Sequence, residues 1–180
     1  MNIATLLRRV AADHAGQVAL RLDDREVRYG RLVDTAARFA AHLRADGLVA
    51  GQRVGVFLPN SLEYVPALLG VWQAGGVAVP LNYLFPEAAL RHAIVDSGAT
   101  HIVTGTGDAP RLEALLVGEK VTLLTTGPEG SFDRALARCE PSRHVMPRRD
   151  ADDALIMYTS GSTGVPKGVR QTHRNTMAQV

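Results

Sequence analysis

Short apolar runs alternate with helix-forming stretches along most of this chain, and this alternation constrains the fold more than any other feature. Residues 54–58 are almost continuously apolar and end at Pro59-Asn60, which is typical of a strand buried on both faces. Comparable runs at 77–79, 101–103 and 121–124 are separated by single segments with helical spacing. Because parallel strands need such crossovers, the pattern predicts an α/β fold with a mostly parallel sheet layered with helices.

Local signals place two helices and one hairpin. Leu32, Ala36, Phe39 and Leu43 recur at helical spacing and predict one apolar face, with Gly47 as the stop. Ser61 is expected to cap the next helix, since a hydroxyl can accept a bond from a free backbone N–H there. A short hairpin is expected before these helices, over residues 18–29.

Residues 126–153 break the alternation, because three prolines interrupt them. The interpretation is a surface excursion with one helix near residues 132–138, or a linker between subdomains. Asp152 and Asp153 end this stretch, and adjacent carboxylates before a buried strand favour a solvated turn over a metal site. We therefore assign no metal ligand in the sequence.

Charge and cysteine content exclude several classes of protein. Lys and Arg number 20 against 18 Asp and Glu, for a net charge of +2, and the basic residues form no stripe suited to nucleic acid. Cys139 is the single cysteine, so an internal disulfide is excluded and a cytoplasmic location is expected. No stretch approaches the ~20 apolar residues of a membrane span.

The segment that carries chemistry follows a predicted strand at residues 154–158. Its glycines allow backbone N–H groups to approach phosphate oxygens, its hydroxyls add donors, and Lys167 adds a mobile positive charge. Pro166 shapes the lysine end of the segment by making Val165 extended. The candidate nucleotide-binding residues are Thr159, Ser160, Gly161, Ser162, Thr163, Gly164 and Lys167, with Lys167 as the candidate catalytic residue.

Two common nucleotide motifs do not fit this segment. A Walker A loop needs Gly before its Lys and a hydroxyl after it, whereas Pro166 precedes Lys167 and Gly168 follows. A dinucleotide-binding fingerprint needs Gly-x-Gly-x-x-Gly, which the spacing of Gly161 and Gly164 does not give. A Gly/Ser-rich turn between two strands would explain the glycines but not the Pro-Lys-Gly ending.

Residues 158–169 closely resemble the signature of the AMP-forming, adenylate-forming enzymes: acyl- and aryl-CoA ligases, luciferases and peptide-synthetase adenylation domains. That signature reads Tyr-Thr-Ser-Gly-(Thr or Ser)-Thr-Gly-x-Pro-Lys-Gly-Val, and every fixed position matches. Residues 73–82 resemble a second recurring block, and their Pro-Leu-Asn ending is more similar to the CoA ligases. The resemblance implies that residues 1–180 are a partial N-terminal large domain, with the C-terminal domain absent.

The resemblance also implies a reaction. A carboxylate attacks the α-phosphate of ATP with Mg²⁺, giving an acyl-adenylate and pyrophosphate, and coenzyme A then displaces AMP to form a thioester. Residues 159–167 would hold the β- and γ-phosphates, while the sites for Mg²⁺ and coenzyme A would lie further along such enzymes. The acid stays open, with fatty acid metabolism as one setting.

Alternatives remain at this point. The chain alone is expected to be inactive and to self-associate, since truncation would bare apolar faces. The thiol acceptor could be a carrier protein in place of coenzyme A, or the chain could be a non-catalytic nucleotide-binding or interaction module. His173 follows the signature, and we expect a hydrogen-bonding residue at a helix start, with no chemical role.

Overall fold

The computed structural model describes residues 1–127, 129–159 and 165–178. The helices are α1 (Ile3–His14), α2 (Tyr29–Ala45), α3 (Tyr64–Gln73), α4 (Glu87–Ser97), α5 (Ala109–Leu115), α6 (Ser131–Arg138) and α7 (His173–Met177). The strands are β1 (Val18–Leu22), β2 (Arg25–Arg28), β3 (Arg53–Phe57), β4 (Val77–Pro80), β5 (Ala99–Gly105), β6 (Thr122–Thr126), β7 (Asp153–Thr159) and β8 (Lys167–Thr172).

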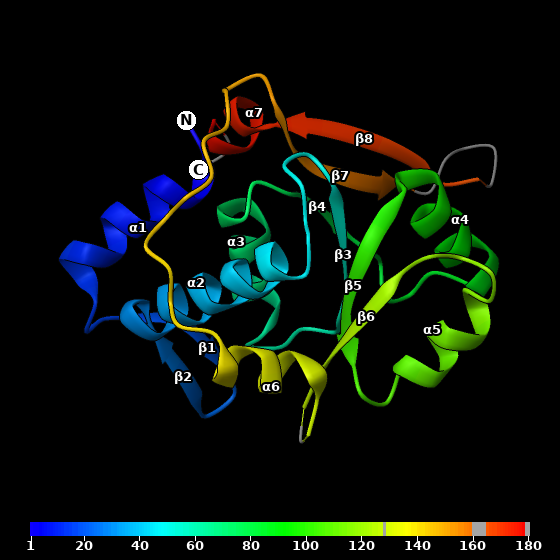
Figure 1. The fold of residues 1–180 in the computed structure, drawn as a ribbon, viewed down its shortest axis with the longest axis horizontal. Helices are drawn as coiled ribbons and strands as arrows, with labels where there is room; N and C mark the ends of the chain where they lie inside the picture. Colours follow the sequence, from blue (N-terminus) through cyan, green and yellow to red (C-terminus); the bar gives the residue numbers. More distant parts are fainter. Residues whose placement is uncertain (128, 160–164, 179–180) are drawn as a thin grey trace.

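The main sheet has the strand order β6-β5-β3-β4-β7-β8, and Figure 1 shows the helices arranged around it. Neighbours from β6 to β7 run parallel, and only β8 is antiparallel to its neighbour. Val54 at the centre lies opposite Ala78 of β4 and His101 of β5. This arrangement confirms the expected α/β fold with a mostly parallel sheet, and β1 and β2 form the expected separate hairpin.

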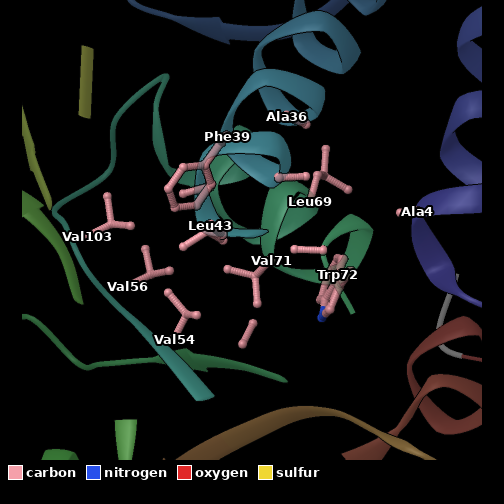
Figure 2. Packing of buried hydrophobic residues seen from close by; sticks show 14 of the residues in the cluster. Ala4, Ala36, Phe39, Leu43, Val54, Val56, Leu69, Val71, Trp72 and Val103 are labelled. Atoms are coloured by element: carbon pink, nitrogen blue, oxygen red, sulfur yellow. The ribbon is translucent and has the colours of Figure 1, made fainter. Parts of the chain in front are cut away.

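The two faces of the sheet bury two different cores, because side chains alternate along each strand. Val54, Val56 and Val103 face α2 and α3, where Phe39 and Leu43 are fully buried (Figure 2). The opposite face carries Phe57, Val79, Ile102 and Tyr158 against α4 and α5. The sheet is therefore covered on both sides, as its continuous apolar runs require.

Helices α2 and α3 approach closely at Gly70. A Cβ added there would lie 2.7 Å from Phe39 Cδ1 and 2.9 Å from the backbone oxygen of Ala36. The Phe39 ring in turn packs against Phe132 of α6, with ring centroids 4.7 Å apart. A side chain at position 70 would therefore have to push α3 away from α2.

The expected helix stop at Gly47 is confirmed, and the expected helix cap at Ser61 is wrong. Gly98 ends α4 with φ of 62°, and Gly47 follows α2 with φ of 88°, both left-handed conformations that glycine adopts without strain. Helix α3 begins at Tyr64 without a side-chain cap, and the hydroxyl of Ser61 has no hydrogen-bond partner among the described residues. The reason is Pro66, which lacks an N–H and is tolerated only in the first turn.

Residues 139–149 cross the surface from α6 to β7 without regular structure, which confirms the interpretation of a surface excursion with one helix. Gln73 holds residues 139–149 in place, because its Nε2 donates to the carbonyl oxygens of Ser142 at 2.7 Å and His144 at 3.2 Å. Asn2 adds a further anchor by donating to the carbonyl oxygens of Trp72 and Met146. Across the described ranges, none of the helices combines the length and apolarity that a membrane crossing requires.

Candidate functional site

Strand β7 carries the candidate segment to the carboxyl edge of the parallel sheet. Ala154 and Leu155 are buried, and the indole Nε1 of Trp72 donates to the carbonyl oxygen of Ala154 at 2.7 Å. The strand ends at Thr159, whose side chain is exposed. Open α/β sheets bind ligands beyond the carboxyl ends of their strands, so the segment starts where such a site is expected.

Lys167 is the first residue of β8, so regular structure begins at the lysine end of the candidate segment. Lys167 pairs with Thr159 across the antiparallel ladder, and Met157 pairs with Val169. Beyond Pro166, which has no N–H to donate, the backbone is free to pair with β7. The sequence pattern did not predict β8, because most of its residues are polar or charged. Charged side chains are common on edge strands.

Two of the seven candidate nucleotide-binding residues fall within the described part of the chain. Thr159 and Lys167 lie opposite each other at the open end of the ladder, and both side chains are exposed. Among the residues that the structure describes, no carboxylate pairs with the Lys167 ammonium group. The remaining candidates, Ser160, Gly161, Ser162, Thr163 and Gly164, lie outside the described residues.

Gly168 is fixed by packing, a role that sequence reasoning missed. It pairs with Tyr158 across the ladder, and an added Cβ would lie 3.1 Å from Tyr158 Cζ and 3.2 Å from Ile156 Cγ2. Such contacts are tighter than ordinary van der Waals distances. The glycine of the Pro-Lys-Gly ending therefore makes room for the Tyr158 ring.

Helix α4 contacts both strands that flank the candidate segment. The Tyr158 hydroxyl donates to Asp96 Oδ2 at 2.6 Å, and His92 Nε2 lies 3.1 Å from the carbonyl oxygen of Pro166. The His92 and Tyr158 rings meet edge to face, with centroids 6.5 Å apart. Burial, followed by the hydrogen bond to Asp96, raises the pKa of Tyr158, so the hydroxyl stays protonated and donates.

A polar cavity of about 370 Å³ lies beside these contacts. Its lining includes two arginines and two aspartates, namely Arg53, Asp96, Asp153 and Arg170. Arg170 donates to Asp153 at 2.6 and 2.9 Å, and Arg53 Nε donates to the carbonyl oxygen of Ser97 at 2.6 Å. Since the charges balance locally, this cavity offers no net attraction to an anion.

The adjacent carboxylates Asp152 and Asp153 are held by arginines. The backbone N–H and the guanidinium of Arg149 donate to Asp152, and these bonds lower the pKa of its carboxyl group. Asp153 pairs with Arg170, as described above. Within the described ranges, no group of three or more potential metal-ligating side chains lies together.

His173 is the first residue of α7 and is fully buried. Its Nδ1 lies 3.4 Å from the backbone N–H of Ile3, and its Nε2 has no partner among the described residues. Burial, with Arg148 and the amino terminus nearby, lowers the pKa of His173 to about 4. The expectation of a hydrogen-bonding residue at a helix start is confirmed in position, although Thr172 supplies the cap.

The sequence profile of the family described as AMP-binding enzyme matches residues 7–180 of this chain. A feruloyl-CoA synthase of Amycolatopsis sp is 37% identical over 157 residues, which cover 87% of this chain and 30% of that protein. The syringomycin synthase SyrB1 of Pseudomonas syringae pv. syringae is 34% identical over 151 residues, covering 84% of this chain and 23% of that protein. The chain thus spans less than a third of either relative.

Among solved structures, a benzoate CoA ligase from Burkholderia xenovorans LB400 superposes with a TM-score of 0.90 at 25% identity. The superposition covers 99% of this chain and 36% of the ligase. The strand order and the helical layers described above are therefore shared with the corresponding part of that ligase.

Proposed function

The chain belongs to the AMP-binding enzyme family, and we propose that it is the ATP-phosphate-binding part of a ligase that activates a carboxylic acid as an acyl-adenylate. In this proposal pyrophosphate leaves as the acyl-adenylate forms, and the thiol of coenzyme A then displaces AMP to take up the acyl group as a thioester. Mg²⁺ belongs to the same proposal as the usual companion of ATP phosphates. A cytoplasmic setting also forms part of it, on the strength of the single cysteine.

The observation that carries the proposal is the complete signature at residues 158–169, placed at the carboxyl end of β7. Thr159 and Lys167 present an exposed hydroxyl and an exposed ammonium group side by side at this edge. A cation that pairs with no carboxylate among the described residues suits the oxygens of a polyphosphate tail. We assign phosphate contacts to Thr159, Ser160, Ser162, Thr163 and Lys167, and close backbone approach to Gly161 and Gly164.

Lys167 is the residue to which we assign a catalytic role. Charge builds up on the departing pyrophosphate as the acyl-adenylate forms, and a cation fixed beside it lowers the barrier. The pairing of Lys167 with Thr159 supports this role, because it fixes the lysine backbone to the end of β7. The terminal ammonium group keeps its freedom to follow the phosphates.

A second candidate acceptor is the thiol of a carrier protein. The similarity to syringomycin synthase SyrB1, whose name does not mention coenzyme A, favours this candidate. The Pro-Leu-Asn sequence at residues 80–82 and the feruloyl-CoA synthase favour coenzyme A. Both candidates share the adenylation step, so the acceptor changes only the second half of the reaction.

Exchange of labelled pyrophosphate into ATP tests the first half-reaction. A chain extended to the length of its relatives should return label to ATP only when a suitable carboxylic acid is present, and should release AMP. Release of ADP and phosphate would place the protein in another class of ligase. Absence of exchange with a broad panel of fatty and aromatic acids would favour the non-catalytic module.

The acceptor is decided by the second half-reaction. Coenzyme A added to the preformed acyl-adenylate should give a thioester at a rate that saturates with coenzyme A. Transfer only to a carrier protein bearing a thiol cofactor would select the second candidate. The 180-residue chain alone should catalyse neither half-reaction, and its elution on a sizing column tests the expected self-association.

A further inference from the structure

We infer that α4 acts as a clamp that positions the phosphate-binding segment, with His92 and Asp96 as positioning residues on either side of it. His92 holds Pro166, directly before Lys167, and Asp96 holds Tyr158, directly before Thr159. The inference rests on the proposed function, which gives the segment its ligand. Neither residue belongs to the signature itself.

The spacing of the two residues allows one helix to contact both strands. His92 and Asp96 are four residues apart and therefore project from the same face of α4. Figure 1 shows α4 beside the ends of β7 and β8 where the described chain is interrupted. The two contacts thus join β7 and β8 to a helix that is itself anchored in the core by Leu90 and Ile94.

The contact with Pro166 fixes the lysine end of the segment. Pro166 is buried, and its carbonyl oxygen accepts from His92 Nε2 when that nitrogen carries the proton. Because proline has no N–H, the carbonyl is its one backbone group for hydrogen bonding. Holding this carbonyl fixes the peptide that joins Pro166 to Lys167, and so fixes where the lysine starts.

The contact with Tyr158 fixes the other end. Tyr158 is 8% exposed, and its ring lies close to Gly168 on β8 and meets the His92 ring edge to face. Its hydroxyl donates to Asp96 Oδ2 at 2.6 Å. Tyr158 therefore couples the two halves of the clamp, and Gly168 is the residue that leaves space for it.

Kinetic measurements on the extended chain test the positioning role. His92→Phe keeps a ring beside Tyr158 and removes the donor, whereas His92→Gln keeps an N–H donor. Loss of the single hydrogen bond should lower kcat/KM for ATP about three- to tenfold in His92→Phe. His92→Gln should recover most of this loss, and KM for the carboxylic acid should stay unchanged in both variants.

The second half of the clamp has its own matched pair. Tyr158→Phe removes the hydroxyl donor and should lower kcat/KM for ATP in the same way, while Asp96→Asn keeps an acceptor oxygen and should retain more activity. Arg91→Gln is the control, because Arg91 lies on α4 next to His92 but pairs with Glu119 at 2.7 Å, away from β8. Arg91→Gln should leave kcat/KM for ATP and KM for the carboxylic acid unchanged.

Amide hydrogen exchange of the 180-residue chain tests the clamp without any turnover. Peptides that cover residues 165–172 should exchange faster in His92→Phe than in wild type, and His92→Gln and Arg91→Gln should match wild type. Unchanged exchange in His92→Phe would overturn the clamp, and so would faster exchange combined with unchanged kcat/KM for ATP. An inactive wild-type extended chain would refute the proposed function, and hydrogen exchange would still decide whether α4 holds the segment.

Discussion

Gly70→Ala is a substitution for which the sequence and the tertiary structure predict opposite signs. Gly70 lies within α3, and alanine in a helix interior is more favourable than glycine by about 1 kcal/mol. From the sequence alone, the substitution should therefore stabilise the chain. The structure places Gly70 where α3 lies close against α2, so that a methyl group has no space.

The size of the effect follows from what surrounds the new methyl group. Its carbon would lie 2.7 Å from Phe39 Cδ1 and 2.9 Å from the Ala36 backbone oxygen. Phe39 is fully buried and cannot withdraw, because Phe132 lies behind it at 4.7 Å. Overpacking of this kind costs up to about 3 kcal/mol, so after the gain in helix propensity the net destabilisation is about 2 kcal/mol.

Urea unfolding of the 180-residue chain measures this effect. Gly70→Ala should lower the free energy of unfolding by about 2 kcal/mol, or the melting temperature by roughly 4–8 °C. In a Phe39→Leu background, whose smaller side chain can move aside, the same change should cost at least about 0.5 kcal/mol less. An increase in stability on Gly70→Ala, or strict additivity with Phe39→Leu, would refute the argument from close packing.

Three further predictions concern the site and its supports. Lys167→Ala in the extended chain should slow pyrophosphate exchange about ten- to a hundredfold. It should change the unfolding free energy by no more than about 0.5 kcal/mol, because the side chain is exposed. An unchanged exchange rate would count against a catalytic role of Lys167. Trp72→Phe should lower the unfolding free energy by about 1–3 kcal/mol, because the buried Ala154 carbonyl loses a donor; a smaller loss in urea unfolding would contradict this reasoning. Burial lowers the pKa of His173 to about 4 in the folded chain, so the unfolded chain binds the proton first. The free energy of unfolding should accordingly be highest above pH 6.5 and should fall by up to about 3 kcal/mol towards pH 4. His173→Gln should flatten this pH dependence.

Much of the fold was predictable because its signals are local. The continuous apolar run at residues 54–58 requires a strand covered on both faces, and β3 lies at the centre of the sheet. Gly47 follows α2 in a left-handed conformation, which glycine adopts without strain in any context. The signature at residues 158–169 was equally legible, since its fixed residues follow one another in the chain.

The tertiary structure decided whatever depends on partners far apart in the sequence. The sequence did not reveal that β7 inserts beside β4, or that residues 167–172 pair with β7, because strand partners are chosen by long-range contacts. Nor did it separate the glycines: Gly168 accommodates the Tyr158 ring, and Gly70 accommodates Phe39.

The support of the candidate site was likewise visible only in three dimensions. His92 and Asp96 are ordinary polar residues of an amphipathic helix until the fold brings Pro166 and Tyr158 against them. The sequence by itself determined most of the elements and the signature of the proposed phosphate-binding segment, since both can be read from residues close together in the chain. The strand order, the close packing and the contacts of α4 come from side chains that meet only after the chain has folded.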